Sequence, residues 1–305
     1  MVVARLPARP DGVQQIHPVR WPADIQPPYH SPMNLEGEGQ DPEITARLVA
    51  AVSQVPALWE QLTAVARTAS SPQSEATKDA AMPLGHYGAI LAGAHLSNGI
   101  EHLLSWHRLL MPPTPEGQPV QAWQPIAAHV TLIRAPMEGA VMCRWFVDLK
   151  AGSTVRIQRA VALLLDDYRN RRAWESDLGV APDSPFGEGK TGAQRYVDLL
   201  KARKAAKIEE VEVLNYTDMF GLYAGYRTPC PGRAMYRLLS GWAHGMEWPQ
   251  GTAKLEAMKD GPKVPGGGVG RLSANDEMSA TYTAIAVRLA RTALHELMTY
   301  RGLAV

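Results

Sequence analysis

Arg237 and His244 lie seven residues apart in a largely apolar stretch of the chain. Because seven residues are almost two turns of α-helix, a helix here places both side chains on one face. A guanidinium can bind a phosphate and stabilise charge that develops on it, and a histidine can accept and return protons near neutral pH. Together they suffice for metal-independent transesterification of a phosphodiester by the RNA 2′-hydroxyl. In the same helix, Ser240 can position a phosphate oxygen and Tyr236 can stack on a base.

Two other stretches with helical spacing carry polar residues where an apolar stripe is expected. His95 and His102 share a face of the first, and Arg134 and Glu138 share a face of the second. A charge among apolar residues must be paired, so Glu138 needs either Arg134 or Arg237 as its cation. Such residues more often form a buried network that fixes helix register than a catalytic site. We treat these four residues as supporting candidates.

Metal and cofactor sites have less support in the sequence. Helical bundles that bind metals carry paired Glu-x-x-His motifs, whereas Glu101 and His102 are adjacent here and His244 precedes Glu247 in reversed order. The glycine run over residues 266–270 lacks the Lys-Ser/Thr ending of a phosphate-binding loop. We therefore predict no metal and no cofactor.

The composition limits the kinds of partner. The chain has 305 residues, of which 46% are hydrophobic and 20% charged, and its net charge is +1. This is enough apolar material for a folded core, but it argues against binding nucleic acid or an acidic membrane through bulk charge. Two cysteines make no disulfide framework, and neither a signal peptide nor an apolar run of membrane-spanning length is visible. We expect a cytoplasmic protein with no membrane partner.

The chain divides into two parts by its proline pattern. Prolines recur through residues 1–41 without a helical period, which predicts an extended or disordered arm. Residues 42–305 predict a single enlarged all-α domain, an up-and-down helical bundle with long connections, because no strand–helix–strand alternation appears. Its long loops are expected over 179–192 and 249–273, the second either slack or a small hairpin, and an irregular aromatic connector over 216–226. We expect helices over about 42–69, 84–110, 120–149, 154–174, 193–211, 233–245 and 273–301. Pro56 is expected to bend the first of these helices, and Pro136 to kink the third.

The segment Tyr236–His244 resembles the Arg-x4–6-His motif of the HEPN-domain proteins, and the helix with Arg134 and Glu138 resembles uncharacterised bacterial helical proteins placed near that superfamily. The resemblance covers about residues 84–302. It implies a bundle of four to five helices, usually a homodimer, with Arg237 and His244 as the catalytic pair around a cleft between subunits. Many such proteins are toxin or defence ribonucleases, and others are inactive scaffolds. Active members usually carry a polar residue where this chain has Leu238.

Two functions from different classes follow. The first is a HEPN-like metal-independent ribonuclease or nucleotide-binding protein, with RNA or a nucleotide as its partner. The second is a non-catalytic helical interaction protein whose polar residues form a buried structural network. A metal or small-molecule enzyme built in the bundle ranks third. Exposure of His244 separates the first two, because a ring sealed by Trp242, Trp248 and the bundle cannot reach RNA.

Overall fold

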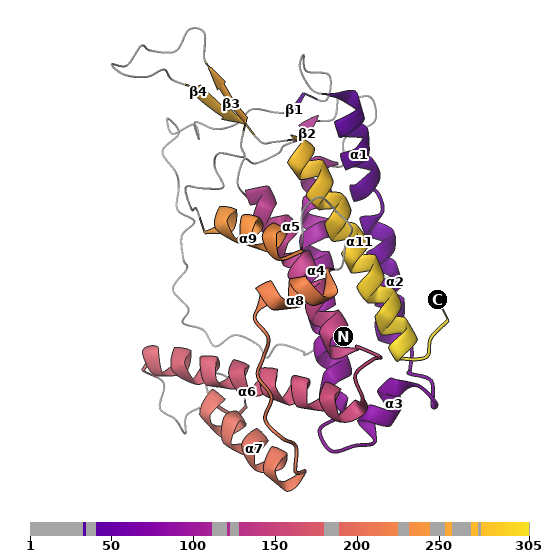
Figure 1. Cartoon of the computed structure of the whole chain (residues 1–305), viewed down its shortest axis with the longest axis vertical. Helices are drawn as coiled ribbons and strands as arrows, with labels where there is room; N and C mark the ends of the chain where they lie inside the picture. Colours follow the sequence, from indigo (N-terminus) through magenta and orange to yellow (C-terminus); the bar gives the residue numbers. More distant parts are fainter. Residues whose placement is uncertain are drawn as a thin grey trace, which may run out of the picture. The chain divides into compact units, whose positions relative to one another are not determined.

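The computed structural model of the chain describes residues 33–34, 41–111, 121–122, 128–179, 189–224, 232–244, 254–257, 270–273 and 276–304. The described part is an all-α helical bundle, as the sequence predicts (Figure 1). Of the arm expected over residues 1–41, only Met33, Asn34 and Asp41 belong to the described residues. None of the described helices is both long enough and apolar enough to cross a membrane.

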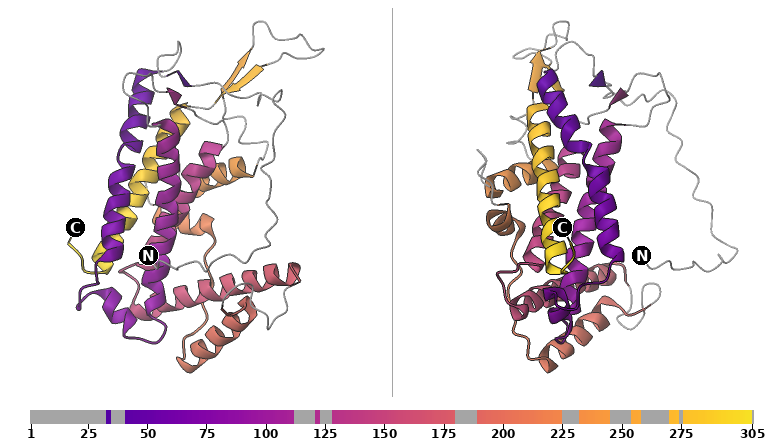
Figure 2. Two further views of the ribbon diagram at one scale, coloured as in Figure 1. Left: turned by 180° about the vertical axis from the view of Figure 1, so that it is seen from behind. Right: turned by 90° about the vertical axis from the view of Figure 1, so that its right-hand side faces the viewer.

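Five helices pack along one another and enclose the main core (Figures 1 and 2). They are α1 (Pro42–Val52), α2 (Val55–Arg67), α4 (His86–Leu110), α5 (Ala128–Phe146) and α11 (Asp276–Tyr300). Large side chains from three of them are fully buried in this core, among them Trp106, Met137, Trp145, Phe146 and Tyr300. Burying such side chains is the dominant source of stability for a fold of this kind.

The contact between α4 and α5 depends on two glycines. A Cβ atom at Gly139 would lie 2.3 Å from the carbonyl oxygen of His95, and one at Gly99 would lie 2.9 Å from the Cα atom of Pro136. No side chain fits at either place, so the two backbones approach each other more closely than larger residues allow. Pro136 is inside α5, as expected from the sequence.

A second cluster of apolar residues joins α6 (Ser153–Asp177) to α7 (Gly192–Ala205). Ile157, Val161 and Leu164 of α6 pack in the same cluster as Leu199 of α7. The start of α7 is fixed by a capping box, in which Thr191 and Gln194 satisfy each other's backbone N–H groups. Helix α6 also contacts α4, α5 and the short helix α3 (Glu75–Ala80), so it links the five-helix core to α7.

An ion-pair network at the base of α6 is the most deeply buried charged group among the described residues. The guanidinium of Arg156 donates to both carboxylate oxygens of Asp79, at 2.7 and 2.8 Å, and to Glu75 at 2.8 Å. The Tyr300 hydroxyl donates to Asp79 at 2.9 Å. Burial favours the neutral form of Asp79, but hydrogen bonds from Arg156, Ser153 and Tyr300 outweigh it and lower the pKa of Asp79. The network fastens α3, α6 and α11 together.

Two short helices, α8 (Tyr216–Tyr223) and α9 (Gly232–Ala243), pack against each other and against α5. Asn215 caps α8 by accepting a hydrogen bond from the backbone N–H of Asp218 at 3.0 Å. A Cβ atom at Gly232 would lie 2.4 Å from the carbonyl oxygen of Phe220. Glycine therefore lets the first turn of α9 approach the backbone of α8.

Two strand pairs complete the described part. Strands β1 (Met33–Asn34) and β2 (Gln121–Ala122) pair antiparallel, as do β3 (Lys254–Ala257) and β4 (Gly270–Ser273). The second pair confirms the hairpin alternative for the segment 249–273. Of the loop expected over 179–192, residues 180–188 lie outside the described part.

Several helix boundaries differ from the sequence prediction. The helix expected over 42–69 is two helices, because Pro56 in the first turn of α2 has no N–H with which to continue α1. The helix expected from residue 120 begins at Ala128, and residues 121–122 are strand β2 instead. Helix α7 ends at Ala205, not near residue 211, and Lys207 has a positive φ of 54°. Helices α3 and α8 were not predicted, since six and eight residues are too short for a clear helical period.

Candidate functional site

Helix α9 is amphipathic, and its two faces hold different candidates. Met235, Tyr236 and Leu239 are buried against α5 and α8. Arg237 and His244 are exposed on the opposite side, and Ser240 between them is half-buried. The backbone N–H of His244 still donates to the carbonyl oxygen of Ser240 at 3.0 Å, so the helical turn extends to the histidine. The spacing that predicts a shared face for Arg237 and His244 is therefore realised.

A sealed His244 ring would exclude the ribonuclease function, because the ring could not reach RNA. The side chain of His244 is open to solvent in the described structure. Seven residues of helix separate it from Arg237 by about 10 Å along the axis, a span that the long arginine side chain can reduce. Both side chains are exposed to solvent and therefore accessible to a ligand. Trp248 and the side chain of Trp242 are outside the described part.

Arg134 and Glu138 form an ion pair within α5. Arg134 Nε donates to Glu138 Oε1 at 2.7 Å, and both side chains are about four-fifths buried, with 17% and 20% of their surface exposed. Of the two cations considered for Glu138, the partner is thus Arg134, and Arg237 points to solvent. Burial favours the neutral form of Arg134, but the charge of Glu138 outweighs it and raises the pKa of Arg134.

Tyr236 connects this ion pair to α9. Its hydroxyl accepts a hydrogen bond from Arg134 Nη2 at 3.2 Å, and its ring centroid lies 4.7 Å from that of Phe220 and 6.0 Å from that of Tyr216. Burial raises the pKa of the hydroxyl, and the charge of Glu138 adds to this. Because Tyr236 is only 9% exposed and its ring packs against Phe220 and Tyr216, the base-stacking role expected of it is wrong. Through its hydrogen bond with Arg134, Tyr236 joins α9 to α5.

The two histidines of α4 are separate from the α9 pair. His95 is half-buried at the contact with α5, where its ring stacks on Phe146 with centroids 6.0 Å apart. Burial lowers the pKa of His95, which keeps the ring neutral at physiological pH. His102, two turns further along α4, is exposed. Among the described residues, no hydrogen bond connects either histidine to Arg237 or His244, and their supporting role stays a prediction.

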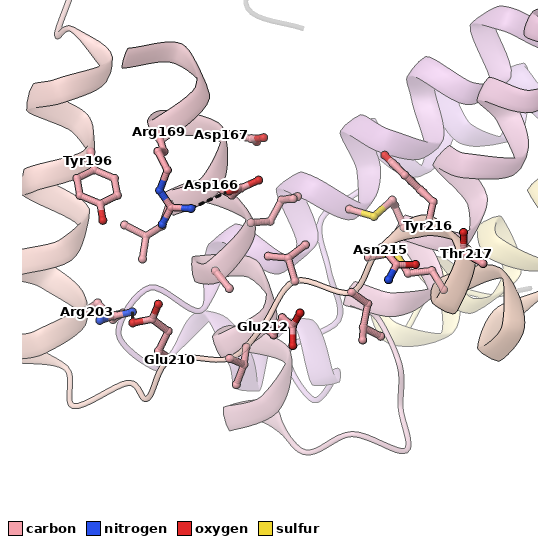
Figure 3. A pocket seen from close by; sticks show the side chains of 18 of the residues that line it. Asp166, Asp167, Arg169, Tyr196, Arg203, Glu210, Glu212, Asn215, Tyr216 and Thr217 are labelled. Carbon is pink, nitrogen blue, oxygen red and sulfur yellow. Dashed lines mark hydrogen bonds and ion pairs between the residues drawn. The ribbon is translucent and has the colours of Figure 1, made fainter. Parts of the chain in front are cut away.

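A cavity of about 770 Å³ opens between α6, α7, the segment 206–215 and α8 (Figure 3). Its two arginines are already paired: Arg169 with Asp166 at 3.0 Å, and Arg203 with Glu210 at 2.9 Å. Burial raises the pKa of Asp167, and the neighbouring Asp166 adds to this. The lining carries more carboxylates than cations, so the cavity disfavours a phosphate ligand. We therefore place the candidate nucleic-acid site on α9 and not here.

Arg233 is a further candidate residue on this face, and the sequence pattern alone does not identify it. It lies one turn before Arg237 on the exposed side of α9, and its Nη2 atom pairs with Asp218 Oδ1 of α8 at 2.8 Å. The spacing of Arg233 and Arg237, four residues apart, was visible in the sequence. Its significance was hidden because α8, which supplies Asp218, was expected to be an irregular connector.

Within the described residues, no group of three or more histidine, cysteine, aspartate or glutamate side chains is placed to hold a metal ion. Cys143 is buried in the core, where desolvation raises the pKa of its thiol far above the ordinary value. Cys230 lies outside the described part.

Comparison with known proteins gives no match, whether against protein-family models, curated proteins or solved structures. The class of this protein therefore rests on its own structure. It is an all-α helical bundle in which an exposed arginine and histidine share one face of a short helix.

Proposed function

We propose that this protein is a HEPN-like, metal-independent ribonuclease of the toxin or defence type, with Arg237 and His244 as its catalytic pair. The observation that carries the proposal is the shared exposure of these two side chains on α9. The other charged candidates, Arg134 and Glu138, already pair with each other.

The reaction that suits this pair is transesterification. His244 removes the proton of a 2′-hydroxyl, and the 2′-oxygen attacks the adjacent phosphorus. Arg237 binds the phosphate oxygens and stabilises the charge that develops on them. The bond between phosphorus and the 5′-oxygen breaks, and that oxygen leaves with a proton from water. The products are a 2′,3′-cyclic phosphate and a 5′-hydroxyl.

The buried contacts beside the pair support this assignment by fixing its helix. Arg134 holds Tyr236, and Tyr236 immediately precedes Arg237. A catalytic group is effective only when its supporting residues are themselves fixed by packing and hydrogen bonds. Arg134, Glu138 and Tyr236 are therefore proposed as positioning residues that do not touch the substrate.

The test compares His244→Ala with a matched control. His244→Ala should reduce RNA cleavage by about 10²–10⁴-fold, as expected for the loss of a general base. Because the side chain is exposed, the free energy of unfolding should change by less than about 1–2 kcal/mol. His295, exposed on α11, is the control, and His295→Ala should leave cleavage unchanged. Equal activity of the two variants would refute the role of His244.

One observation favours the second candidate function, a non-catalytic helical interaction protein. The Arg134–Glu138 pair and Tyr236 form the partly buried polar network that this reading expects. Under it, the protein cleaves no RNA, and Arg134→Met lowers stability without an activity to lose.

The proposal includes a homodimer and, as the coarser possibility for the same site, nucleotide binding without cleavage. In a dimer of the HEPN kind, two copies of Arg237 and His244 share one cleft. Light scattering of the purified protein should give twice the mass of the 33.3 kDa chain. If the protein is a monomer and still cleaves RNA, Arg237 and His244 remain the proposed catalytic pair, but the cleft shared by two subunits is refuted.

A further inference from the structure

A line of polar and basic side chains runs along α9 and extends beyond the proposed catalytic pair. Arg233, Arg237, Ser240 and His244 follow one another at intervals of four, three and four residues, so they share one face of the helix. Arg233, Arg237 and His244 are exposed, and Ser240 is half-buried. We refer to these four residues as the α9 stripe.

Arg233 is held in place by α8. Its Nη2 atom lies 2.8 Å from Asp218 Oδ1, and the other oxygen of Asp218 accepts a hydrogen bond from Asn215 Nδ2 at 2.8 Å. The carboxylate is therefore oriented by the cap of its own helix. With 59% of its side chain exposed, Arg233 keeps further N–H groups available to solvent.

Gly221 of α8 provides the space in which the Arg233 side chain lies. A Cβ atom at Gly221 would be 2.7 Å from Arg233 Nε and 3.2 Å from its Cγ. In Gly221→Ala the added carbon would displace the Arg233 side chain. Because that side chain is flexible, it can move without disturbing the backbone of α8 or α9.

The spacing along the stripe matches a nucleic-acid strand. Four residues of helix advance about 6 Å, which is comparable to the distance between adjacent phosphates of an extended single strand. One phosphate on Arg237 and the next on Arg233 would follow the helix axis. Arg233 can contact a phosphate with one edge of its guanidinium while the other edge stays on Asp218, because the group has five N–H donors in a planar fork.

Among the described residues, the carboxylates next to α9 leave the stripe positive. Asp218 of α8 offsets one of the two guanidinium charges, and Glu138 of α5 is paired with Arg134. A stripe of this kind attracts phosphates locally, although the net charge of the whole chain is only +1.

We infer that the α9 stripe binds a single-stranded oligoribonucleotide, with Arg233 holding the phosphate next to the one that Arg237 and His244 act on. The inference rests on the proposed function and specifies its substrate class: a strand with at least two consecutive phosphates, not a free nucleotide. Attack by the 2′-hydroxyl in line with the leaving oxygen also requires a flexible strand, since the regular A-form duplex does not offer that geometry.

Binding and cleavage are measured separately to test this. The binding probe is a fluorescein-labelled twelve-residue 2′-O-methyl oligouridylate, which lacks the attacking hydroxyl and is read by fluorescence anisotropy. Loss of a charge-assisted contact in Arg233→Ala should weaken its binding by about tenfold or more, and lower the slope of log affinity against log salt by about 0.7. Gly221→Ala should weaken binding several-fold although Arg233 is present. Arg67→Ala, an exposed arginine at the end of α2, is the control and should bind as the unaltered protein does.

Cleavage of the dinucleotide UpA, which has a single internucleotide phosphate, completes the test. Arg67→Ala should cleave UpA as the unaltered protein does. The melting temperature of Arg233→Ala should stay within a few degrees of that of the unaltered protein, which excludes a general loss of structure. If Arg233→Ala binds the long probe like Arg67→Ala, the inference is overturned while cleavage of RNA by the unaltered protein still supports the proposed function. Equally tight binding of duplex RNA would also overturn it. If the protein binds the probe through Arg233 but cleaves nothing, the proposed ribonuclease fails and the binding inference stands.

Discussion

The buried pair of Arg156 and Asp79 gives the sharpest prediction of stability. Arg156 is 2% exposed and Asp79 is 1% exposed, and two hydrogen bonds of 2.7 and 2.8 Å join them. Arg156→Met keeps most of the side-chain volume but leaves Asp79 without its cation in the interior. Removing one partner of a buried pair costs about 3–5 kcal/mol, because an uncompensated charge stays behind. Urea unfolding should therefore have a midpoint lower by about 1–2 M.

An exposed pair on the same helix provides the control. Arg169 pairs with Asp166 at 3.0 Å, with 61% and 44% of the side chains exposed. Solvent screens this pair, so Arg169→Met should cost at most about 1 kcal/mol. Unfolding of Arg156→Met and Arg169→Met at the same urea concentration would contradict the difference between the buried and the exposed pair. Arg156→Lys, which keeps the charge and loses the two-pronged contact, should fall between them.

Three further predictions concern the fold and the positioning of α9. Gly139→Ala should destabilise the protein by about 1–3 kcal/mol or more, because the added carbon meets the backbone of α4. Gly93→Ala should stabilise it by up to about 1 kcal/mol, because no atom lies within 4 Å of the added carbon. Thermal melts of the two variants test this difference. The free energy of unfolding, measured by urea titration, should fall below about pH 4. The pKa values of Asp79 and Asp148 are lowered in the folded state, so each carboxylate contributes stability that is lost as the pH falls through its folded-state pKa. In Arg156→Met this loss should be smaller, because Asp79 no longer pairs with Arg156. Tyr236→Phe should cost about 0.5–1.5 kcal/mol through the lost hydrogen bond to Arg134, and an unchanged melting curve would contradict the bridge between α5 and α9.

The long helices could be predicted from the sequence because their apolar residues repeat over several turns. Helix α4 begins two residues from the position expected, and α6 and α9 each begin one residue from it. The short elements could not: α8 has eight residues, and its helical form depends on its cap at Asn215 and on packing against α9 and α5. Pro56 was expected to bend one helix and instead starts a second one.

The candidate site was predictable in part. The shared face of Arg237 and His244 follows from helical spacing alone, and the pairing of Glu138 with a cation follows from the cost of burying a charge. Whether Tyr236 points to solvent or to the core depends on α8, whose Phe220 packs on its ring, and no local pattern in the sequence shows this. No local pattern in the sequence shows the Arg156–Asp79 pair either, because the two residues are 77 positions apart in the chain.

The central claim is that Arg237 and His244 on α9 cleave RNA without a metal ion. The measurement that tests it most directly is cleavage of a 5′-labelled oligoribonucleotide by the purified protein in excess EDTA, with products separated by gel electrophoresis and their ends identified by mass spectrometry. Our account predicts fragments ending in a 2′,3′-cyclic phosphate, no cleavage of the same sequence with 2′-O-methyl groups, and loss of the fragments in both Arg237→Ala and His244→Ala. Intact RNA under these conditions, or fragments that persist in both variants, would contradict it.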